Sequence, residues 1–190
     1  MTEQQAIELL KHGDISGLEL LVQNYYVLAV RSAYFVNLDR ALAEDIVQAA
    51  FLRVYERIDQ FDAARPFRPW FLRMVVNDAH MAVRKRARLV TLNSEPQDDE
   101  YAQFSQELPG SDLALDELMI EAETTEAVWL ALGKLSPDQR AVIVLRYYLG
   151  LSEAEMSTQL DCTPGTVKSR LHRAKRRLRQ LMPTWLGPVP

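Results

Sequence analysis

Apolar residues recur at three- and four-residue intervals along much of the chain, with polar residues between them. One stripe consists of Ile46, Ala50, Val54 and Ile58, and another of Val167, Leu171, Ala174, Leu178 and Leu181. This spacing gives a helix a single apolar face. Gly and Pro are absent from residues 18–65, 70–95, 111–132 and 166–182, so neither residue type interrupts a helix there. The pattern predicts an all-α protein, with long helices over 17–36 and 41–60.

Several helix ends can be read from their residue types. Ser136–Gln139 and Ser152–Glu155 both match the capping box, in which the first side chain and the fourth satisfy each other's backbone N–H groups. Pro137 falls at the first helical position, where a missing N–H has no cost. Gly133 and Gly150 stand where a helix would need a left-handed terminating residue.

The stretch from 152 to 179 has the layout of a helix-turn-helix. A capped helix over 152–160 is followed by a turn at 161–163, and a second helix starts at Pro164 with Thr163 as its cap. The face opposite its apolar stripe carries Gly165, Ser169, His172, Arg173 and Arg176, flanked by Lys168, Arg170, Lys175, Arg177 and Arg179. Such a helix suits a DNA major groove and its phosphates.

Interpretations of these residues other than DNA binding stay open. The cations could simply solvate a surface helix, or the helix could lie on a membrane surface or bind a calmodulin-like partner. His172 has no acidic cluster beside it, which favours a surface or DNA contact over a metal site. Cys162 is the single cysteine, and it is better explained as a small packing residue than as a redox sensor.

The N-terminal half contains an aromatic and arginine-rich loop over 61–70, sequence FDAARPFRPW. Unpaired bases stack on aromatic rings while guanidinium groups hold phosphates, so the loop is a candidate for single-stranded DNA. A further helix should turn Phe71, Leu72, Val75 and Val76 inward and end in the basic run 84–88. For Phe61, Phe67 and Trp70 the alternative is burial in the core.

Charge is divided sharply along the chain. Residues 1–88 carry 12 basic and 11 acidic residues, residues 89–133 carry 11 acidic and no basic ones, and residues 134–190 carry 10 basic and 4 acidic ones. The net charge of −4 therefore hides a basic C-terminal part that suits nucleic acid. We expect two domains, 1–92 and 112–190, joined by a flexible acidic linker at 93–111.

The remaining composition excludes several classes. Apolar residues make up 48% of the chain, which is enough for a packed core, and one cysteine makes no internal disulfide. The first residues lack the layout of a signal peptide, and no apolar run is long enough to span a membrane, so we expect an intracellular soluble protein. No phosphate-binding loop, dinucleotide motif or nucleophile elbow is present, which argues against an enzyme. No cofactor or metal is expected.

Two groups of motifs together resemble one family. The strings AEDIVQAAF at 43–51 and RPWFLR at 68–73, with Asn77, are similar to region 2 of bacterial sigma factors. Similarity to region 4 lies in LSP at 135–137, Arg140, LRY at 145–147 and TPGTVKSRLHRA at 163–174. With only these two regions present, the chain resembles the extracytoplasmic-function (ECF) subfamily.

The resemblance implies a cytoplasmic initiation factor that binds core RNA polymerase through the clamp helices and flap, and that binds promoter DNA. It places Glu44, Asp45, Gln48 and Phe51 in the segment that docks on polymerase. It assigns the −10 element to Phe61, Arg65, Phe67, Arg68, Trp70, Asn77, Arg84, Lys85 and Arg86. It assigns the −35 element to Thr163, Gly165, Thr166, Lys168, Ser169, Arg170, His172, Arg173, Arg176 and Arg177. An anti-sigma partner, which can hold such a factor at the membrane, is a further implication, and the acidic linker could mimic nucleic acid or act as a plain spacer.

Three residues depart from the family's pattern. Asp161 stands where the turn usually has Gly, and Ser157 replaces a common Ala. Met81 occupies a position where Asp is frequent, so the family's −10 preference is not carried over. An ordinary helix-turn-helix repressor with a ligand-sensing N-terminal domain would explain residues 136–179 equally well. It leaves the segment 44–51 and the aromatic loop unexplained.

Overall fold

The computed structural model describes residues 1–91, 128 and 130–181, and within them the chain is helical with no strand. The all-α prediction is confirmed. The N-terminal half contains α1 (Glu3–Lys11), α2 (Ser16–Asn37), α3 (Arg40–Arg57), the short 3₁₀ turn η1 (Ile58–Gln60) and α4 (Phe67–Thr91). The C-terminal half contains α6 (Pro137–Ile143), the π-helical turn η3 (Val144–Tyr148), α7 (Glu153–Gln159) and α8 (Pro164–Leu181). The predicted linker at 93–111 lies outside the described residues.

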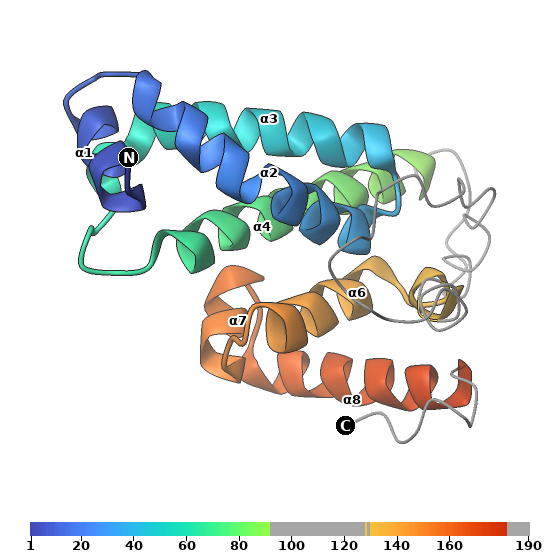
Figure 1. Cartoon of the computed structure of the whole chain (residues 1–190). Coiled ribbons are helices and arrows are strands. Elements are labelled where there is room, and N and C mark those ends of the chain that lie inside the picture. The colour runs from blue at the N-terminus through green and yellow to red at the C-terminus, as the bar shows by residue number, and fades with distance from the viewer. Residues whose placement is uncertain (92–127, 129, 182–190) are drawn as a thin grey trace.

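Helices α2, α3 and α4 form a bundle, and α1 closes one end of it (Figure 1). The predicted stripe on α3 is buried in this bundle, as are Phe71, Leu72, Val75 and Val76 of α4. Where α1 meets α2, the backbones approach so closely that a Cβ on Gly17 would lie 2.2 Å from the Ala6 carbonyl oxygen. Only glycine permits that approach.

The C-terminal half lies against the bundle on the side of α2 and α4, with α8 at the outer edge (Figure 1). Both α4 and α2 contact α6, and a single cluster of buried apolar residues runs through the two halves. Arg140 of α6 is buried at this junction, where its Nε donates to the Val36 carbonyl of α2 over 2.7 Å and its Nη1 to the Leu135 carbonyl over 2.8 Å. Burial lowers the pKa of Arg140 to about 10, so the guanidinium remains charged at neutral pH.

The structure tests the expected helix ends. Both capping boxes form, at Ser136 and at Ser152, and Pro137 occupies the first turn. Gly150 has the expected positive φ of 70°. Gly133 does not, because it is itself helical and the chain leaves that helix through Lys134 and Leu135, whose N–H groups bond back to Ala131 and Leu132.

Candidate nucleic-acid interface

The helix-turn-helix forms with the predicted bounds, and its turn is fixed by local hydrogen bonds. Asp161 has φ of 48°, so this aspartate adopts the left-handed conformation that glycine usually supplies. Ser157 donates its hydroxyl to the Cys162 carbonyl over 2.6 Å, which ties α7 to the turn. The Thr163 hydroxyl accepts from the Thr166 N–H over 3.2 Å and caps α8. The serine that departs from the family's pattern therefore has a structural role here.

Helix α8 presents a cationic outer face. Its inner face is buried through Val167, Leu171, Ala174 and Leu178, as the apolar stripe predicts. The exposed residues of the helix are Pro164, Gly165, Lys168, His172, Arg173, Arg176, Arg177, Arg179 and Gln180. In the middle of the helix Arg173 donates to the Ser169 hydroxyl over 3.3 Å, and one turn earlier Ser169 donates to the Thr166 carbonyl over 2.9 Å. These bonds orient Arg173 on the outer face.

Arg170 is placed differently from its neighbours on α8. Its Nη2 lies 2.5 Å from Oδ2 of Asp138 in α6, and its Nη1 lies 3.8 Å from the Cys162 sulfur. The ion pair turns this side chain toward α6 and away from the open face of the helix. Cys162 is partly buried and packs against the core, which fits the packing interpretation.

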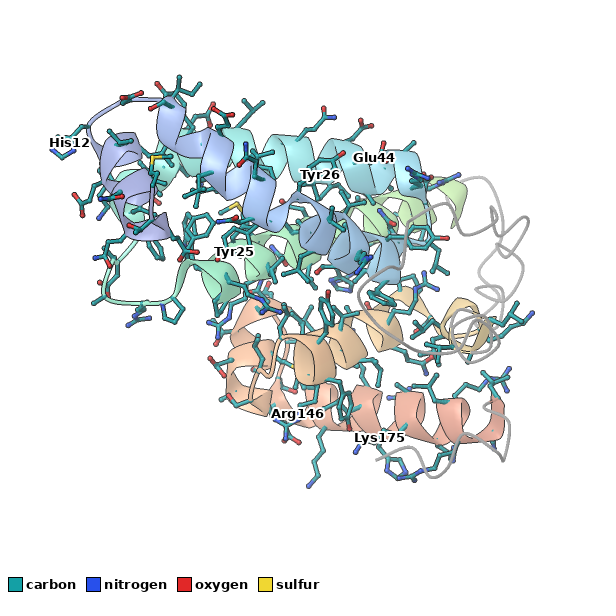
Figure 2. The ribbon with its side chains drawn as sticks, viewed as in Figure 1. His12, Tyr25, Tyr26, Glu44, Arg146 and Lys175 are labelled. Atoms are coloured by element: carbon teal, nitrogen blue, oxygen red, sulfur yellow. The ribbon has the colours of Figure 1, made fainter. Side chains whose placement is uncertain are left out.

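A second aromatic group, which sequence reasoning missed, lies beside α8. Lys175 stands over the Tyr147 ring at 5.3 Å from the centroid, within the range of a cation–π contact. Tyr147 is exposed, and neighbouring Arg146 donates to the Leu151 carbonyl over 2.9 Å. Figure 2 shows Lys175 and Arg146 at the edge of the molecule away from the bundle. The LRY string at 145–147 contains this tyrosine, but the sequence did not predict the π-helical turn that exposes its ring.

The outer face of α3 is largely polar, and Leu52 is its one large apolar residue. Asp45 and Gln48 are exposed, and Leu52 one turn later is 60% exposed. Glu44 is half-buried and pairs with Arg40 over 3.0 Å. Phe51 is buried, 4.5 Å between ring centroids from Phe71, so its side chain is not part of this exposed face, and its contact with polymerase stays a prediction. Leu52 was missed because an isolated exposed leucine has no signature in an apolar pattern.

The aromatic residues of the 61–70 segment form a cluster rather than an exposed loop. Helix α4 starts at Phe67, inside the segment, and Pro69 is tolerated in its first turn. Phe67 is 1% exposed and lies 5.5–5.6 Å, between ring centroids, from Tyr25, Phe61, Trp70 and Phe71. Phe61 is buried as well, while Trp70 is half-buried. Burial in the core, the alternative left open for Phe61 and Phe67, is what the structure shows.

The cations of the 61–70 segment and of the later turns of α4 are exposed or half-buried. Arg68 is exposed, and Arg65 is exposed in a loose pair with Asp62. Along α4, Lys85 and Arg86 are exposed, and Asn77 and Arg84 are half-buried. Arg86 also pairs with Asp39 over 3.3 Å, across the start of α3. Met81 is 54% exposed on the same helix, so a large apolar side chain replaces a carboxylate on an open surface.

The described part of the chain contains neither a membrane-spanning helix nor a cluster of metal-ligand residues. None of its helices is long and apolar enough to cross a membrane. Residues 1–91, 128 and 130–181 contain no group of three or more His, Cys, Asp or Glu side chains that could hold a metal ion.

Comparison with known proteins identifies both halves. The family model for sigma-70 region 2 matches residues 21–89, and that for sigma-70 region 4 matches residues 125–178. The chain is 32% identical over 183 residues to the ECF RNA polymerase sigma-E factor of Escherichia coli K12, covering 92% of this chain and 91% of that protein. It is 29% identical over 180 residues to the ECF RNA polymerase sigma factor SigW of Bacillus subtilis, covering 95% and 96%.

Two solved structures have a similar fold. One is CnrH in complex with the cytosolic domain of CnrY, with a TM-score of 0.56 at 24% identity, covering 94% of this chain and 96% of that one. The other is the sigma factor RpoE in complex with the anti-sigma factor NepR from Bartonella quintana, with a TM-score of 0.56 at 23% identity, covering 86% and 94%.

An all-helical chain with region 2 followed by a helix-turn-helix of region 4 defines a bacterial sigma factor, which directs the initiation of transcription. The chain belongs to the ECF sigma factor family, because both regions are matched and its ECF relatives align with nearly its whole length. Its relatives are initiation factors rather than enzymes.

Proposed function

We propose that the chain reads the −35 element with α8 and captures the unwound −10 element with region 2, while α3 docks on core RNA polymerase. Residues 1–92 and 112–190 are the two working domains in this proposal, and 93–111 is the linker. The observation that carries it is the capped α7–turn–α8 unit, whose one open face is cationic from Lys168 to Arg179. Membrane or calmodulin-like binding would need a basic amphipathic helix but not this turn.

Position along α8 separates base contacts from phosphate contacts. In a helix-turn-helix the first turns of the second helix enter deepest into the major groove, so Ser169 and Arg173 are assigned to base edges. Thr163, Gly165, Thr166 and Lys168 lie around the entry point, His172 and Arg176 share the outer face with Arg173, and Arg177 lies on its flank. Arg170 stabilises the fold through Asp138 and is left out of the contact set.

The test is binding of the polymerase holoenzyme to wild-type and scrambled upstream elements across a salt series. Arg173→Ala should lose about 1–3 kcal/mol of sequence preference, whereas Arg177→Ala should keep the preference and reduce the salt slope by about one. Gln180→Ala, an exposed and uncharged change on the same helix, is the control. If Arg173→Ala weakens both templates equally, the orientation of α8 in the groove is wrong.

The polymerase surface is assigned to the exposed face of α3. Asp45, Gln48 and Leu52 are presented together there, and an apolar residue ringed by polar ones is a common centre for a protein interface. Glu44 supports this face through Arg40. Figure 2 shows Glu44 and Lys175 at opposite edges of the molecule, so α3 can bind polymerase without covering α8.

Affinity for core polymerase tests this surface. Asp45→Lys and Leu52→Asp should each weaken binding at least tenfold while thermal unfolding stays unchanged, because both side chains are exposed. Glu19→Lys introduces the same charge change on α2, away from this face, and should bind normally. Wild-type affinity for the two α3 variants would remove the docking assignment.

For the −10 element, we assign phosphate contacts to Arg65, Arg68 and the basic run 84–86. Asn77 is assigned to a base, and the half-buried Trp70 is the ring available for stacking. Phe61 and Phe67 are buried and stabilise the conformation of the 61–70 segment. Arg68→Ala should lower permanganate reactivity of unpaired thymines at the start site of a duplex promoter, while transcription from a pre-melted template should be restored. No rescue by the pre-melted template would indicate a docking defect instead.

An anti-sigma protein is the remaining proposed partner, and the cytoplasm the proposed location. Support comes from the similar fold of two proteins solved as complexes, CnrH with the cytosolic domain of CnrY and the sigma factor RpoE with the anti-sigma factor NepR. Affinity purification of the tagged chain from its own host, with and without detergent-solubilised membranes, tests both statements. Recovery of core polymerase alone from both fractions would contradict the anti-sigma proposal.

A further inference from the structure

A continuous row of accessible side chains runs along one side of α4. Residues spaced three and four positions apart share a side of a helix. On α4 one such side carries Trp70, Met74, Asn77, Met81 and Lys85. The first three are half-buried, Met81 is 54% exposed, and Lys85 is exposed. At about 1.5 Å per residue this α4 row is about 22 Å long. It leads from the proposed stacking ring to a proposed phosphate contact.

The other polar side chains in the middle of α4 are engaged within the protein. His80 is 1% exposed, and its Nε2 lies 2.6 Å from Oδ1 of Asp138. Arg73 lies 2.5 Å from a carboxylate oxygen of Glu155. A helix advances by about 100° per residue, so His80 and Arg73 both lie about a quarter turn around the axis from Met81. Met81 therefore lies beside these contacts and is open to solvent.

The charges around Met81 are mainly positive. Lys85 follows one turn later and Arg88 two turns later, and both are exposed. Asp78 is the single acidic residue of α4, and its Oδ1 accepts from Nη1 of Arg53 in α3 over 3.2 Å. That ion pair offsets the negative charge nearest to Met81 in the helix. A phosphate backbone is therefore attracted to the part of α4 in which Met81 lies.

Methionine gives the α4 row an apolar and polarisable tip among polar groups. A thioether is only a weak hydrogen-bond acceptor and has no attraction for a phosphate. It packs well against aromatic rings, and apolar side chains in general contact the C5-methyl group of thymine. A single exposed apolar residue is common on protein surfaces. Met81 differs from such a residue because it lies between Asn77, which suits a base edge, and Lys85, which suits a phosphate.

We propose that Met81 is a specificity-determining residue for the −10 element, which contacts the C5-methyl group of a thymine and so favours thymine over cytosine at one position. The inference rests on the proposed assignment of α4 to the −10 element. Asn77, one turn earlier and about 6 Å along the helix axis, is left to read the polar edge of the base. A carboxylate at position 81 would instead accept from the amino group of cytosine. The methionine therefore changes which base is preferred.

Changes of single methyl groups in the promoter test this contact. The polymerase holoenzyme is bound to a promoter fragment found by start-site mapping. Each thymine of its −10 element is replaced in turn by deoxyuridine, and each cytosine by 5-methylcytosine. These replacements remove or add one methyl group and leave the hydrogen-bonding atoms of the base unchanged. The affinity of the holoenzyme should change about fourfold at one position, which is the effect of burying one methyl-sized group.

Variants at position 81 assign the methyl effect to this side chain. Met81→Ala should abolish it, and Met81→Leu should retain it, because leucine remains apolar and nearly as long. Met81→Asp should reverse the preference from thymine to cytosine. Val27→Ala truncates an apolar residue of α2 that is similarly exposed, at 53%, and should leave the methyl effect intact. Because all of these positions are exposed, thermal unfolding should change little.

Two results would overturn the inference. One is an unmodified chain that is indifferent to every methyl group of the −10 element, and the other is a Met81→Ala variant that keeps the full methyl effect. Failure of the proposed −10 function would show separately, because Arg68→Ala and Asn77→Ala would then bind and open the promoter normally. If those two variants are impaired and no methyl effect exists, region 2 reads the −10 element without Met81.

A pre-melted template distinguishes the two places where the methyl group can be read. We expect the methyl effect to persist on that template, because α4 is assigned to the unwound element and the thymine is then an unpaired base. A methyl effect that is found on the duplex promoter alone assigns the same contact to a thymine in the major groove. Loss of the effect on both templates in Met81→Ala supports the contact in either case.

Discussion

Replacement of Phe67 by alanine should destabilise the protein far more than replacement of its exposed neighbour Arg68. The ring of Phe67 is buried at the junction of α2 and α4, against Tyr25, Phe61, Trp70 and Phe71. Truncating a buried phenylalanine costs about 3–5 kcal/mol, since transfer energy and cavity cost add. For a chain of this size the melting temperature should fall by about 6–20 °C.

Urea unfolding followed by tryptophan fluorescence measures this directly. Phe67→Ala should lower the midpoint with little change in the slope, which reports the surface exposed on unfolding. Arg68→Ala should stay within about 0.5 kcal/mol of the unmodified chain, because its side chain is exposed. A loss below about 1 kcal/mol for Phe67→Ala, together with impaired promoter opening, would refute the reasoning. The ring would then be a stacking platform and not part of the core.

Three other changes have defined outcomes. Gly17→Ala should cost about 1–3 kcal/mol in urea unfolding, since its Cβ would meet the Ala6 carbonyl oxygen at 2.2 Å. Ser157→Ala should cost about 1 kcal/mol by losing the bond to the Cys162 carbonyl, while exposed Glu153→Ala costs less. The lowered pKa of Asp138 stabilises the fold above its ordinary value of 3.8, and this stability is lost as pH falls through the folded pKa. Acid unfolding of Asp138→Asn should therefore be less steep below about pH 4.

Features that depend on neighbours in the sequence were predicted well. Both capping boxes, the turn at Asp161, the start of α8 at Pro164 and its buried stripe follow from residue types a few positions apart. Regular helix geometry converts such spacings directly into faces and ends. The fold class and the cationic face of α8 could therefore be obtained without coordinates.

Features that depend on distant parts of the chain could not be predicted. Phe67 resembles a loop aromatic in sequence, and it is buried because Tyr25, 42 residues earlier, packs against it. His80 is buried only because Asp138, separated by 58 residues, binds it. Arg170 shares the spacing of the outer face, yet an ion pair to α6 turns it inward. Helical periodicity assigns a face to each residue but does not reveal what packs there.

Transcription with purified core RNA polymerase tests the central claim most directly. Core enzyme is mixed with the full-length chain and a library of genomic promoter fragments, and the 5′ ends of the transcripts are sequenced. The account predicts discrete start sites preceded by two shared sequence blocks about 25 base pairs apart, spanned by about 85 Å of duplex. Arg173→Ala should relax the upstream block alone. Start sites that do not depend on the chain, or fragments bound tightly by the chain without polymerase, would contradict its role as a sigma factor.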